Sequence, residues 1–555
     1  MNRPISIDSV LAAADGSAPE SLARAFARNV ERYAGNEAIK PPDGPAISYA
    51  DLGRRVREAL AVFGHLRLTA GDRIAICLPN SPEWAVMTCA AALAGLCVVP
   101  INLRYREDEL LHALSGSGAK VLFAVTQFLS NSVLDRLRAL AGGSFGGAKE
   151  RGPIAALPRL EHLVFCDDAD VPGSASYAGL ARACSPVQTS FHELADTRSG
   201  EDPMWLFWTS GTTSRPKAAL LPQSTIEIVW QWTTLAGYRP DDRVLTSRPL
   251  FYIAGHFWSM LGPLVQGACS VIASRFSAEE MVQLCASERI TILSGNPVMF
   301  KRLIQSDAFD AGAFRRVRLG YFGGSALPLD EMRKIRDAIG FESLIQTYGM
   351  TELGGFIMST LPTDSLETAC ASCGAVFTDI ELKLVSPDTG RPVAQGETGL
   401  LLTRGQKLIR YENLPEEERS RLYDAQGWYR TGDLMRQLPD GRYQLVGRLK
   451  DLIKVGGENV TAAEIEDTLM QHPAVSLVAV IGRKDADKGE VPVAFVEFKP
   501  GAALSVAELK AWSKAHMAPY KVPADIYEMQ AQEWPMTSTG KIAKHTLMAH
   551  TAGLA

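Results

Sequence analysis

One stretch, Arg73 to Pro100, constrains the fold more than any other: RIAICLPNSPEWAVMTCAAALAGLCVVP. Two short apolar runs flank a segment of helix length with a single charged residue, Glu83. We expect Ser81 to cap this helix, Pro82 to occupy its first position and Gly95 to end it. A strand, a helix and a second strand in succession predict a βαβ unit within a parallel sheet.

The same arrangement recurs further along the chain. Residues Arg243 to Ser274 read RVLTSRPLFYIAGHFWSMLGPLVQGACSVIAS, with Gly267 before the second apolar run. Repeated units of this kind are typical of α/β proteins. We therefore predict an α/β fold with a large N-terminal domain of βαβ-rich parallel sheets.

Length and composition indicate a globular chain of several domains. Its 555 residues, 46% hydrophobic and 21% charged, can bury a sizeable core. The uncharged run Ala85 to Asn102 is interrupted by Gly95 and Pro100, so we expect buried core and no membrane span. A net charge of −5 without a Lys/Arg block disfavours nucleic acid as a partner.

Cysteine usage and the N-terminus point to the cytoplasm. The nine cysteines have no regular spacing, as in a reducing compartment, and the first residues lack the apolar region of a signal peptide. The pair Cys370 and Cys373 is a weak candidate for a redox or metal site, because no second Cys or His pair accompanies it.

The last part of the chain predicts a smaller α+β domain. Thr461 with Glu464, and Ser505 with Glu508, have capping-box spacing. The runs VSLVAVIGR and VPVAFVEFKP between them predict strands. We expect domains over residues 1–446 and 447–555, joined through GRLKD.

A polar loop, FWTSGTTSRPKAAL from Phe207 to Leu220, suggests a phosphate ligand. Hydroxyl groups and backbone N–H groups donate to phosphate oxygens, and a lysine adds positive charge. The loop is not a P-loop, because Pro216 replaces the second glycine and Ala218 follows the lysine. Taken alone, it could equally be a solvated turn.

Further motifs follow this loop in a fixed order: YFGGSALP, QTYGMTE, GETGLLLTRG, GWYRTGDL, GRLKDLIKVGGENVTAAEIE and TSTGK. Together they resemble the adenylate-forming superfamily of acyl-CoA synthetases, amino-acid adenylation domains and luciferases. The resemblance spans Ser48 to Leu547, and the combination of motifs is far more specific than any one of them.

The resemblance implies an acid–CoA ligase. Such an enzyme uses ATP and Mg²⁺ to convert a carboxylic acid, here expected to be a fatty or aromatic monocarboxylate, to acyl-AMP, and then transfers the acyl group to CoA. The C-terminal domain is implied to be a mobile lid with a hinge near Lys450. Alternatives are a stand-alone adenylation enzyme that loads a separate carrier protein, and a non-catalytic homologue; a homodimer is also left open.

Roles carry over from the superfamily residue by residue. The resemblance implies that the loop from Thr209 to Lys217 closes over the phosphates of ATP. It also implies that Thr213 and Glu352 bind Mg²⁺. Lys541 is implied to contact both the acid carboxylate and the α-phosphate during adenylation. Lys541, Glu352, Thr213 and Lys217 form the implied catalytic set. The implied ATP- and AMP-binding residues are Thr209, Ser210, Gly211, Thr212, Thr213, Gly324, Ser325, Ala326, Thr347, Tyr348, Gly349, Met350, Thr351, Asp433, Arg448 and Lys541.

The acid and CoA sites follow in the same way. Gly456, Gly457 and Glu458 correspond to the CoA tunnel. The acid pocket is expected to be apolar and aromatic, formed by Tyr252, His256, Phe257, Phe322, Gly323, Met350 and Leu353.

Three positions depart from the superfamily pattern. Ser214 and Ala218 replace glycines of the phosphate loop, which would constrain the backbone at positions that tolerate positive φ in the superfamily. Tyr252 stands where a histidine is usual.

Overall fold

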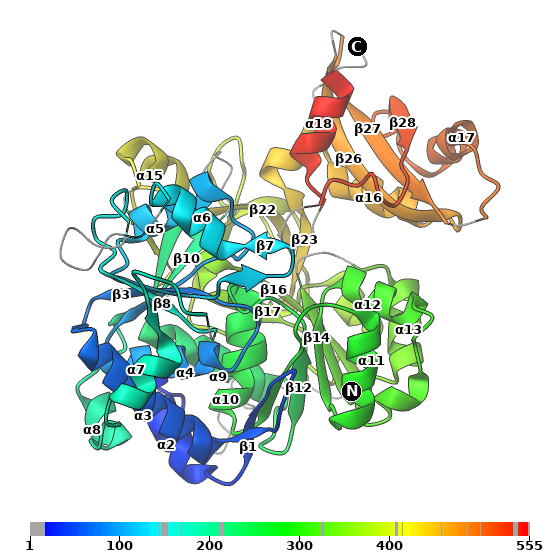
Figure 1. The fold of residues 1–555 in the computed structure, drawn as a ribbon. Coiled ribbons are helices and arrows are strands. Elements are labelled where there is room, and N and C mark those ends of the chain that lie inside the picture. Colours follow the sequence, from blue (N-terminus) through cyan, green and yellow to red (C-terminus); the bar gives the residue numbers. More distant parts are fainter. Residues whose placement is uncertain are drawn as a thin grey trace.

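The computed structural model describes residues 11, 17–143, 145, 154–167, 169–209, 216–323, 327–405, 409–412, 414–456, 458–485, 487–499, 501–536 and 542–552. Two large sheets with helices on their faces make up most of the molecule, and a smaller C-terminal body lies to one side (Figure 1). The predicted α/β fold, with a large N-terminal part and a small C-terminal one, is confirmed.

The first large sheet has the strand order β21-β11-β10-β4-β3-β5-β8-β9. Its strands are β3 (Arg73–Cys77), β4 (Cys97–Pro100), β5 (Val121–Ala124), β8 (His162–Phe165), β9 (Ala175–Ser176), β10 (Pro203–Thr209), β11 (Lys217–Pro222) and β21 (Arg410–Tyr411). The accompanying elements are α2 (Leu22–Arg32), α3 (Tyr49–His65), α4 (Glu83–Ala94), α5 (Glu107–Ser117), α6 (Val133–Leu140), α7 (Tyr177–Ala183), α8 (Phe191–Asp196) and the hairpin of β6 (Gln127–Phe128) and β7 (Asn131–Ser132).

The predicted βαβ unit is β3, α4 and β4. The two strands pair in parallel, with Arg73 opposite Cys97, and Gly95 ends the helix in the left-handed region at φ 71°. The expected Ser81 cap is wrong, because α4 begins at Glu83 after Pro82 and no side chain caps it. Almost every residue of α4 is buried, which explains why no charged residue follows Glu83 in this helix.

The second large sheet has the order β18-β17-β16-β15-β14-β12-β13-β1-β2. Its strands are β1 (Glu37–Lys40), β2 (Ile47–Ser48), β12 (Arg243–Thr246), β13 (Cys269–Ile272), β14 (Ile292–Gly295), β15 (Leu319–Gly323), β16 (Ser343–Met350), β17 (Gly355–Ser359) and β18 (Ala375–Val376). The helices around it are η1 (Gln223–Thr225), α9 (Ile226–Leu235), the π-helix η2 (Ala254–Leu261), α10 (Gly262–Val265), α11 (Ala278–Ser287), α12 (Pro297–Gln305), η3 (Ala311–Phe314), α13 (Leu329–Ile339), η4 (Thr351–Leu353) and α14 (Leu366–Ala371).

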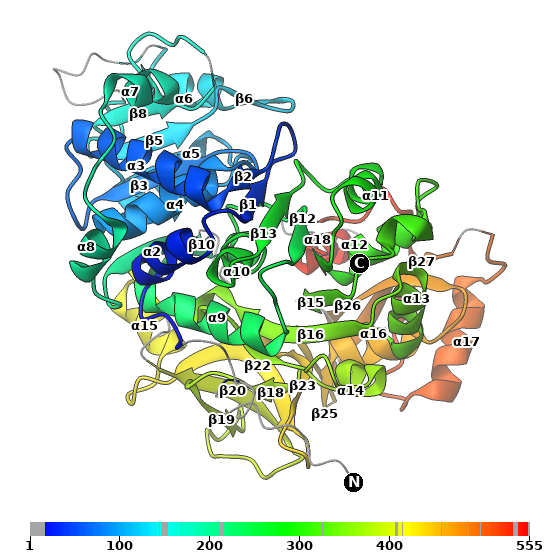
Figure 2. The same ribbon diagram turned by 90° about the horizontal axis from the view of Figure 1, so that it is seen from below.

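The second predicted unit is also present, because β12 and β13 pair in parallel. Its connection is a π-helix followed by a short α-helix, and π-helical turns are frequent at functional sites. Seen from below, the first sheet lies mostly among blue and cyan helices and the second mostly among green ones (Figure 2).

A third sheet was not expected from the sequence. It is antiparallel and contains β19 (Glu381–Val385), β20 (Thr398–Arg404), β22 (Tyr429–Gln437) and β23 (Tyr443–Arg448), with α15 (Glu416–Leu422) before β22. Its outer strands β19 and β23 are only partly buried, so they lack the continuous apolar runs that made the parallel strands recognisable.

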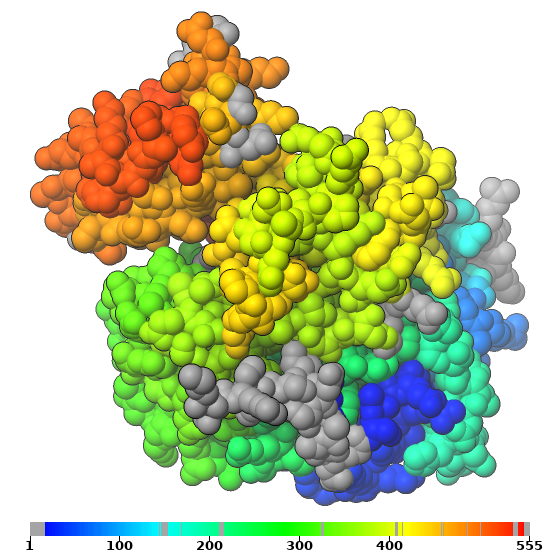
Figure 3. Space-filling view, turned by 180° about the vertical axis from the view of Figure 1, so that it is seen from behind, coloured from blue at the N-terminus to red at the C-terminus, as the bar shows by residue number. Residues whose placement is uncertain are grey.

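The C-terminal body begins after the turn η5 (Leu449–Asp451) and contains a five-stranded sheet. Its elements are β24 (Leu452–Val455), β25 (Glu458–Thr461), α16 (Ala462–Met470), β26 (Val475–Asp485), β27 (Gly489–Phe498), α17 (Val506–His516), β28 (Asp525–Glu528) and α18 (Lys544–Ala552). From behind, this body projects beyond the rest of the molecule in orange and red (Figure 3).

The two expected capping boxes differ. Ser505 and Glu508 form a complete box at the start of α17. At α16, Thr461 accepts from the Glu464 N–H, but the Glu464 carboxylate pairs with Lys521, so only half of the box forms. The runs predicted as strands form β26 and β27, which pair antiparallel.

No helix in the described ranges is long and apolar enough to cross a membrane. All nine cysteines are free thiols. Cys370 donates to the Leu327 carbonyl, while Cys373 is buried beside Gln346. Within the described residues, no group of three or more His, Cys, Asp or Glu side chains could hold a metal ion.

Candidate active site

The hairpin of β16 and β17 carries the QTYGMTE motif at the edge of the second sheet. Two glycines allow its strands to approach closely. A Cβ on Gly349 would lie 1.8 Å from the Gly355 carbonyl oxygen, and Gly355 has φ +114° with the Trp258 ring 2.5 Å from its own Cβ position. Thr347 donates to the Phe322 carbonyl at 3.0 Å, which links this hairpin to β15.

Three side chains from the hairpin and the antiparallel sheet meet at Asp433. This carboxylate is 1% exposed and accepts a hydrogen bond from the Tyr348 hydroxyl at 2.7 Å. Arg448 lies directly across the β22–β23 ladder, with its Nε 2.9 Å from Asp433 Oδ1. Burial, reinforced by Asp433, holds the pKa of Tyr348 well above its ordinary value, so the phenol stays a donor.

One oxygen of Asp433 retains hydrogen-bonding capacity. Although Oδ1 lies within ion-pair distance of Arg448, it accepts no well-directed hydrogen bond in the described structure. Buried carboxylate oxygens are normally satisfied, so an unsatisfied one suits a hydroxyl donor from a ligand. The resemblance to adenylate-forming enzymes implies that Asp433 binds the nucleotide, through a ribose hydroxyl.

Glu352 lies in a cluster of tyrosines. Its Oε1 accepts from the Tyr411 hydroxyl at 2.8 Å, and Tyr411 lies 3.5 Å from the Thr209 hydroxyl. Burial first, and then the Glu352 charge, raise the pKa of Tyr423 to about 12 and that of Tyr429 above its usual range. Glu352 is thus linked to the start of the phosphate loop through Tyr411, a residue that no sequence pattern pointed to.

A single partly exposed carboxylate is compatible with Mg²⁺ bound to a nucleotide. Mg²⁺ is usually held by one or two carboxylates together with phosphate oxygens and water. Glu352 could be that carboxylate, since its chain segment follows β16 next to the residues expected around the nucleotide. The second predicted ligand, Thr213, lies outside the described residues.

Lys217 is engaged by a carboxylate. Its ammonium lies 2.7 Å from Glu418 of α15, and the lysine side chain is only 12% exposed. The same strand holds Ala218, which pairs with Trp208 in β10. Ala218 is not among the described non-glycine residues with positive φ, so the expected backbone constraint at this position is absent.

The predicted acid-pocket residues divide into two groups. Tyr252, Gly323 and Met350 retain exposed surface, and the Tyr252 hydroxyl accepts from Asn102 at 3.1 Å. The others lie fully in the core here, each with no exposed surface: His256, Phe257, Phe322 and Leu353.

His256 is a neutral core histidine in this structure. Trp205 donates to its Nε2 at 3.1 Å, and its Nδ1 lies 3.2 Å from the Leu250 carbonyl. These contacts require a proton on Nδ1 and none on Nε2. Burial lowers its pKa to about 3, so the ring is neutral at neutral pH. Because both ring nitrogens are already engaged, neither is free for acid or base chemistry.

The remaining predicted residues lie at the junction with the C-terminal body or outside the described ranges. Lys450 is exposed in η5, Gly456 has φ 59° and Glu458 begins β25. Thr351 lies in η4 beside Glu352. The predicted residues outside the described part are Ser210, Gly211, Thr212, Thr213, Gly324, Ser325, Ala326, Gly457 and Lys541, and Ser214 is also outside it.

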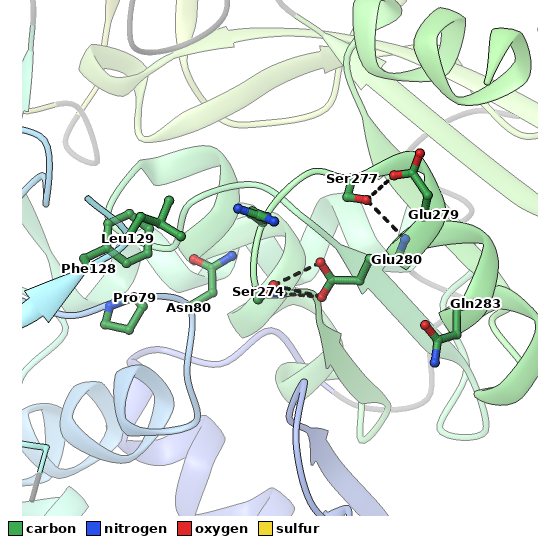
Figure 4. A pocket seen from close by; sticks show the side chains of 10 residues that line it. Pro79, Asn80, Phe128, Leu129, Ser274, Ser277, Glu279, Glu280 and Gln283 are labelled. Atoms are coloured by element: carbon green, nitrogen blue, oxygen red, sulfur yellow. Dashed lines mark hydrogen bonds between the residues drawn. The ribbon is translucent and has the colours of Figure 1, made fainter. Parts of the chain in front are cut away.

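A separate cavity of about 430 Å³ opens between the two large sheets (Figure 4). The β6–β7 hairpin forms one wall through Phe128 and Leu129, and the start of α11 forms the other. None of the predicted site residues lines it. Asn80 lines this cavity and also contacts the segment before Tyr252. Its amide donates to the carbonyls of Arg248 and Ala273 and accepts from the Leu250 N–H.

The sequence matches the AMP-binding enzyme family over residues 26–411 and the AMP-binding enzyme C-terminal domain over residues 464–541. The chain belongs to the AMP-binding enzyme family. This confirms the resemblance to adenylate-forming enzymes.

Named relatives of the family cover nearly the whole chain. The mitochondrial medium-chain acyl-CoA ligase of Danio rerio is 32% identical over 94% of this chain and 87% of its own length. A structure of anthranilate CoA ligase AuaEII with anthranoyl-AMP is 26% identical, with TM-score 0.83 over 98% of this chain and 99% of that one. ATP-bound MatB from Rhodopseudomonas palustris is 25% identical, with TM-score 0.83 over 96% and 99%.

Proposed function

We propose that this enzyme is an ATP-dependent, AMP-forming acid–CoA ligase. The acid carboxylate attacks the α-phosphate of ATP and releases pyrophosphate, which gives acyl-AMP. The thiol of CoA then attacks the acyl carbon, and AMP leaves. The family match and the CoA ligases among the relatives support this reaction.

The Tyr348–Asp433–Arg448 cluster is the observation that carries the proposal. It combines a buried carboxylate, an open acceptor on Oδ1 and a half-exposed guanidinium. A ribose hydroxyl would donate to Oδ1, while Arg448 would face ribose or phosphate.

Lys217 and Glu352 would act on the phosphates. Lys217 would exchange Glu418 for phosphate oxygens as the phosphate loop closes. Mg²⁺, held by Glu352 and the phosphates, would supply charge neutralisation during phosphoryl displacement. By the resemblance, Lys541 would contact the acid carboxylate and the α-phosphate of ATP as they react.

The acid is expected to have an apolar body. Tyr252 and Met350 are the exposed side chains of the predicted pocket, and both are compatible with aliphatic or aromatic groups. We further propose that the C-terminal body rotates about Lys450 in η5 between the two half-reactions.

The test is AMP release from ATP and Mg²⁺ with a panel of aliphatic and aromatic acids, comparing free CoA with a phosphopantetheinylated carrier protein. We expect AMP and acyl-CoA in equal amounts with at least one acid. Transfer to the carrier alone would indicate an enzyme that loads a carrier. The absence of pyrophosphate exchange with every acid would mean that the protein is not a ligase.

A further inference from the structure

A positive charge without an anionic partner lies at the carboxyl end of β12. Arg248 follows this strand, and its guanidinium lies over the Tyr321 ring of β15, 5.9 Å from the ring centroid. Within the described part of the chain, no carboxylate forms an ion pair with it. The aromatic face provides only a weak substitute for a counter-ion.

Other arginines of the same sheet are paired. Arg243, at the amino end of β12, contacts Glu37 and Glu288, and Arg318, just before β15, contacts Asp242. The amino ends of these strands therefore carry structural ion pairs. Arg248 lies at the opposite end, where open α/β sheets bind their ligands.

The environment of Arg248 makes an unpaired charge costly. Its side chain is only partly exposed, and burial lowers the pKa of the guanidinium. Desolvating a charge without a partner destabilises a fold, so such groups are usually paired with an anion. A ligand carboxylate would supply the missing partner and would make two parallel hydrogen bonds with the guanidinium.

Aromatic contacts connect Arg248 to the expected acid pocket. The Tyr321 hydroxyl donates to the Trp258 carbonyl at 3.1 Å. Trp258 stacks on Phe356 at 4.1 Å, and Phe356 pairs with Gly349 in the β16–β17 hairpin. Arg248 is therefore connected, through Tyr321 and Trp258, to the hairpin that carries the proposed nucleotide and acid residues.

We propose that Arg248 binds a second carboxylate of the acid, so that the preferred substrates are dicarboxylic acids with an apolar linker. One carboxylate would react with ATP while Arg248 binds the other. This inference rests on the proposed ligase function and narrows the substrate class expected from the pocket residues. Arg248 is here a specificity residue with no role in the chemical step.

The test compares octanedioate with octanoate, which have the same chain length, in the AMP-release assay. We expect the wild-type enzyme to have the higher kcat/KM for octanedioate. Arg248→Met should lower that value roughly ten- to a hundredfold while leaving octanoate within about threefold, and Arg248→Lys should retain part of the preference. Arg275→Met, a change at the neighbouring cavity, is the control and should preserve the preference.

A binding measurement separates this inference from the proposed function. Octanedioate without ATP should raise the melting temperature of the wild-type protein and not that of Arg248→Met. Removing an unpaired charge should leave the melting temperature of the free variant equal or higher. The role of Arg248 would be overturned if octanedioate stabilised both proteins equally, even with normal ligase activity. It would also be overturned if Arg248→Met kept the wild-type ratio of kcat/KM for octanedioate to kcat/KM for octanoate. Loss of AMP formation with every acid, together with Arg248-dependent binding of octanedioate, would refute the ligase function alone.

Discussion

Among single residues, Asp433 has the clearest expected role. Asp433→Asn removes the charge that faces Arg448 and replaces one acceptor oxygen by a donor. Hydrogen bonds to charged groups contribute about 1.5–3 kcal/mol, so the KM for ATP should rise roughly ten- to a hundredfold. Pyrophosphate exchange at varied ATP concentration measures this effect.

Asp440→Asn is the matched control for this change. Asp440 lies in the turn between β22 and β23 and pairs with Arg442, away from the hairpin. Its KM for ATP should stay at the wild-type value. An unchanged KM in Asp433→Asn would remove Asp433 from the nucleotide site.

His256 predicts a dependence of stability on pH. Its pKa is about 3 in the folded protein and near 6.5 when exposed, so below pH 6.5 the unfolded chain binds a proton that the folded protein does not. Stability should therefore fall by about 2 kcal/mol between pH 7 and pH 5 through this residue. In His256→Gln, melting temperatures should fall less over this range than in the wild type. The exposed His65→Gln should behave like the wild type, and the same slope in all three proteins would contradict the neutral core histidine.

At the scale of elements, an ion pair between Lys217 and Glu418 connects β11 to α15, and it would have to open for Lys217 to bind phosphate as proposed. Glu418→Gln removes the carboxylate that engages Lys217, so the lysine should reach phosphate at a smaller cost. We expect the KM for ATP to fall severalfold, since partly exposed ion pairs contribute about 1 kcal/mol or less. Glu416→Gln on the same helix is the control, because Glu416 contacts Arg419. A rise in KM for Glu418→Gln would mean that Glu418 positions Lys217 productively.

The elements also differ in how well the sequence predicts them. Buried parallel strands such as β3 and β4 are continuous apolar runs, so their βαβ unit was predictable. The half-buried antiparallel strands β19 and β23 were not predictable, because they lack such runs. The Tyr411–Glu352 contact was not predictable either, because it joins residues far apart in sequence that no local pattern connects. Arg248 was likewise unremarkable in sequence, since only the fold shows that no described carboxylate forms an ion pair with it.

For the whole molecule, we expect the C-terminal body to rotate about η5 during the reaction. Proline fixes φ and removes a backbone donor, so Lys450→Pro should hinder this rotation without disrupting either body. Acyl-AMP formation should persist at near the wild-type rate while transfer to CoA slows at least tenfold. Separate assays of the two half-reactions check this, and Lys454→Ala, an exposed change in β24, should affect neither. Equal slowing of both half-reactions by Lys450→Pro would argue against a hinge there.

The most direct test of the account is a single-turnover reaction of enzyme with ATP, Mg²⁺ and an accepted acid, first without CoA and then with it. The account predicts that acyl-AMP and pyrophosphate accumulate on the enzyme in the first stage. When CoA is added, acyl-AMP should disappear as acyl-CoA and AMP appear in equal amounts. Release of ADP and phosphate, or acyl-CoA formation from ATP without any acyl-AMP, would contradict the account.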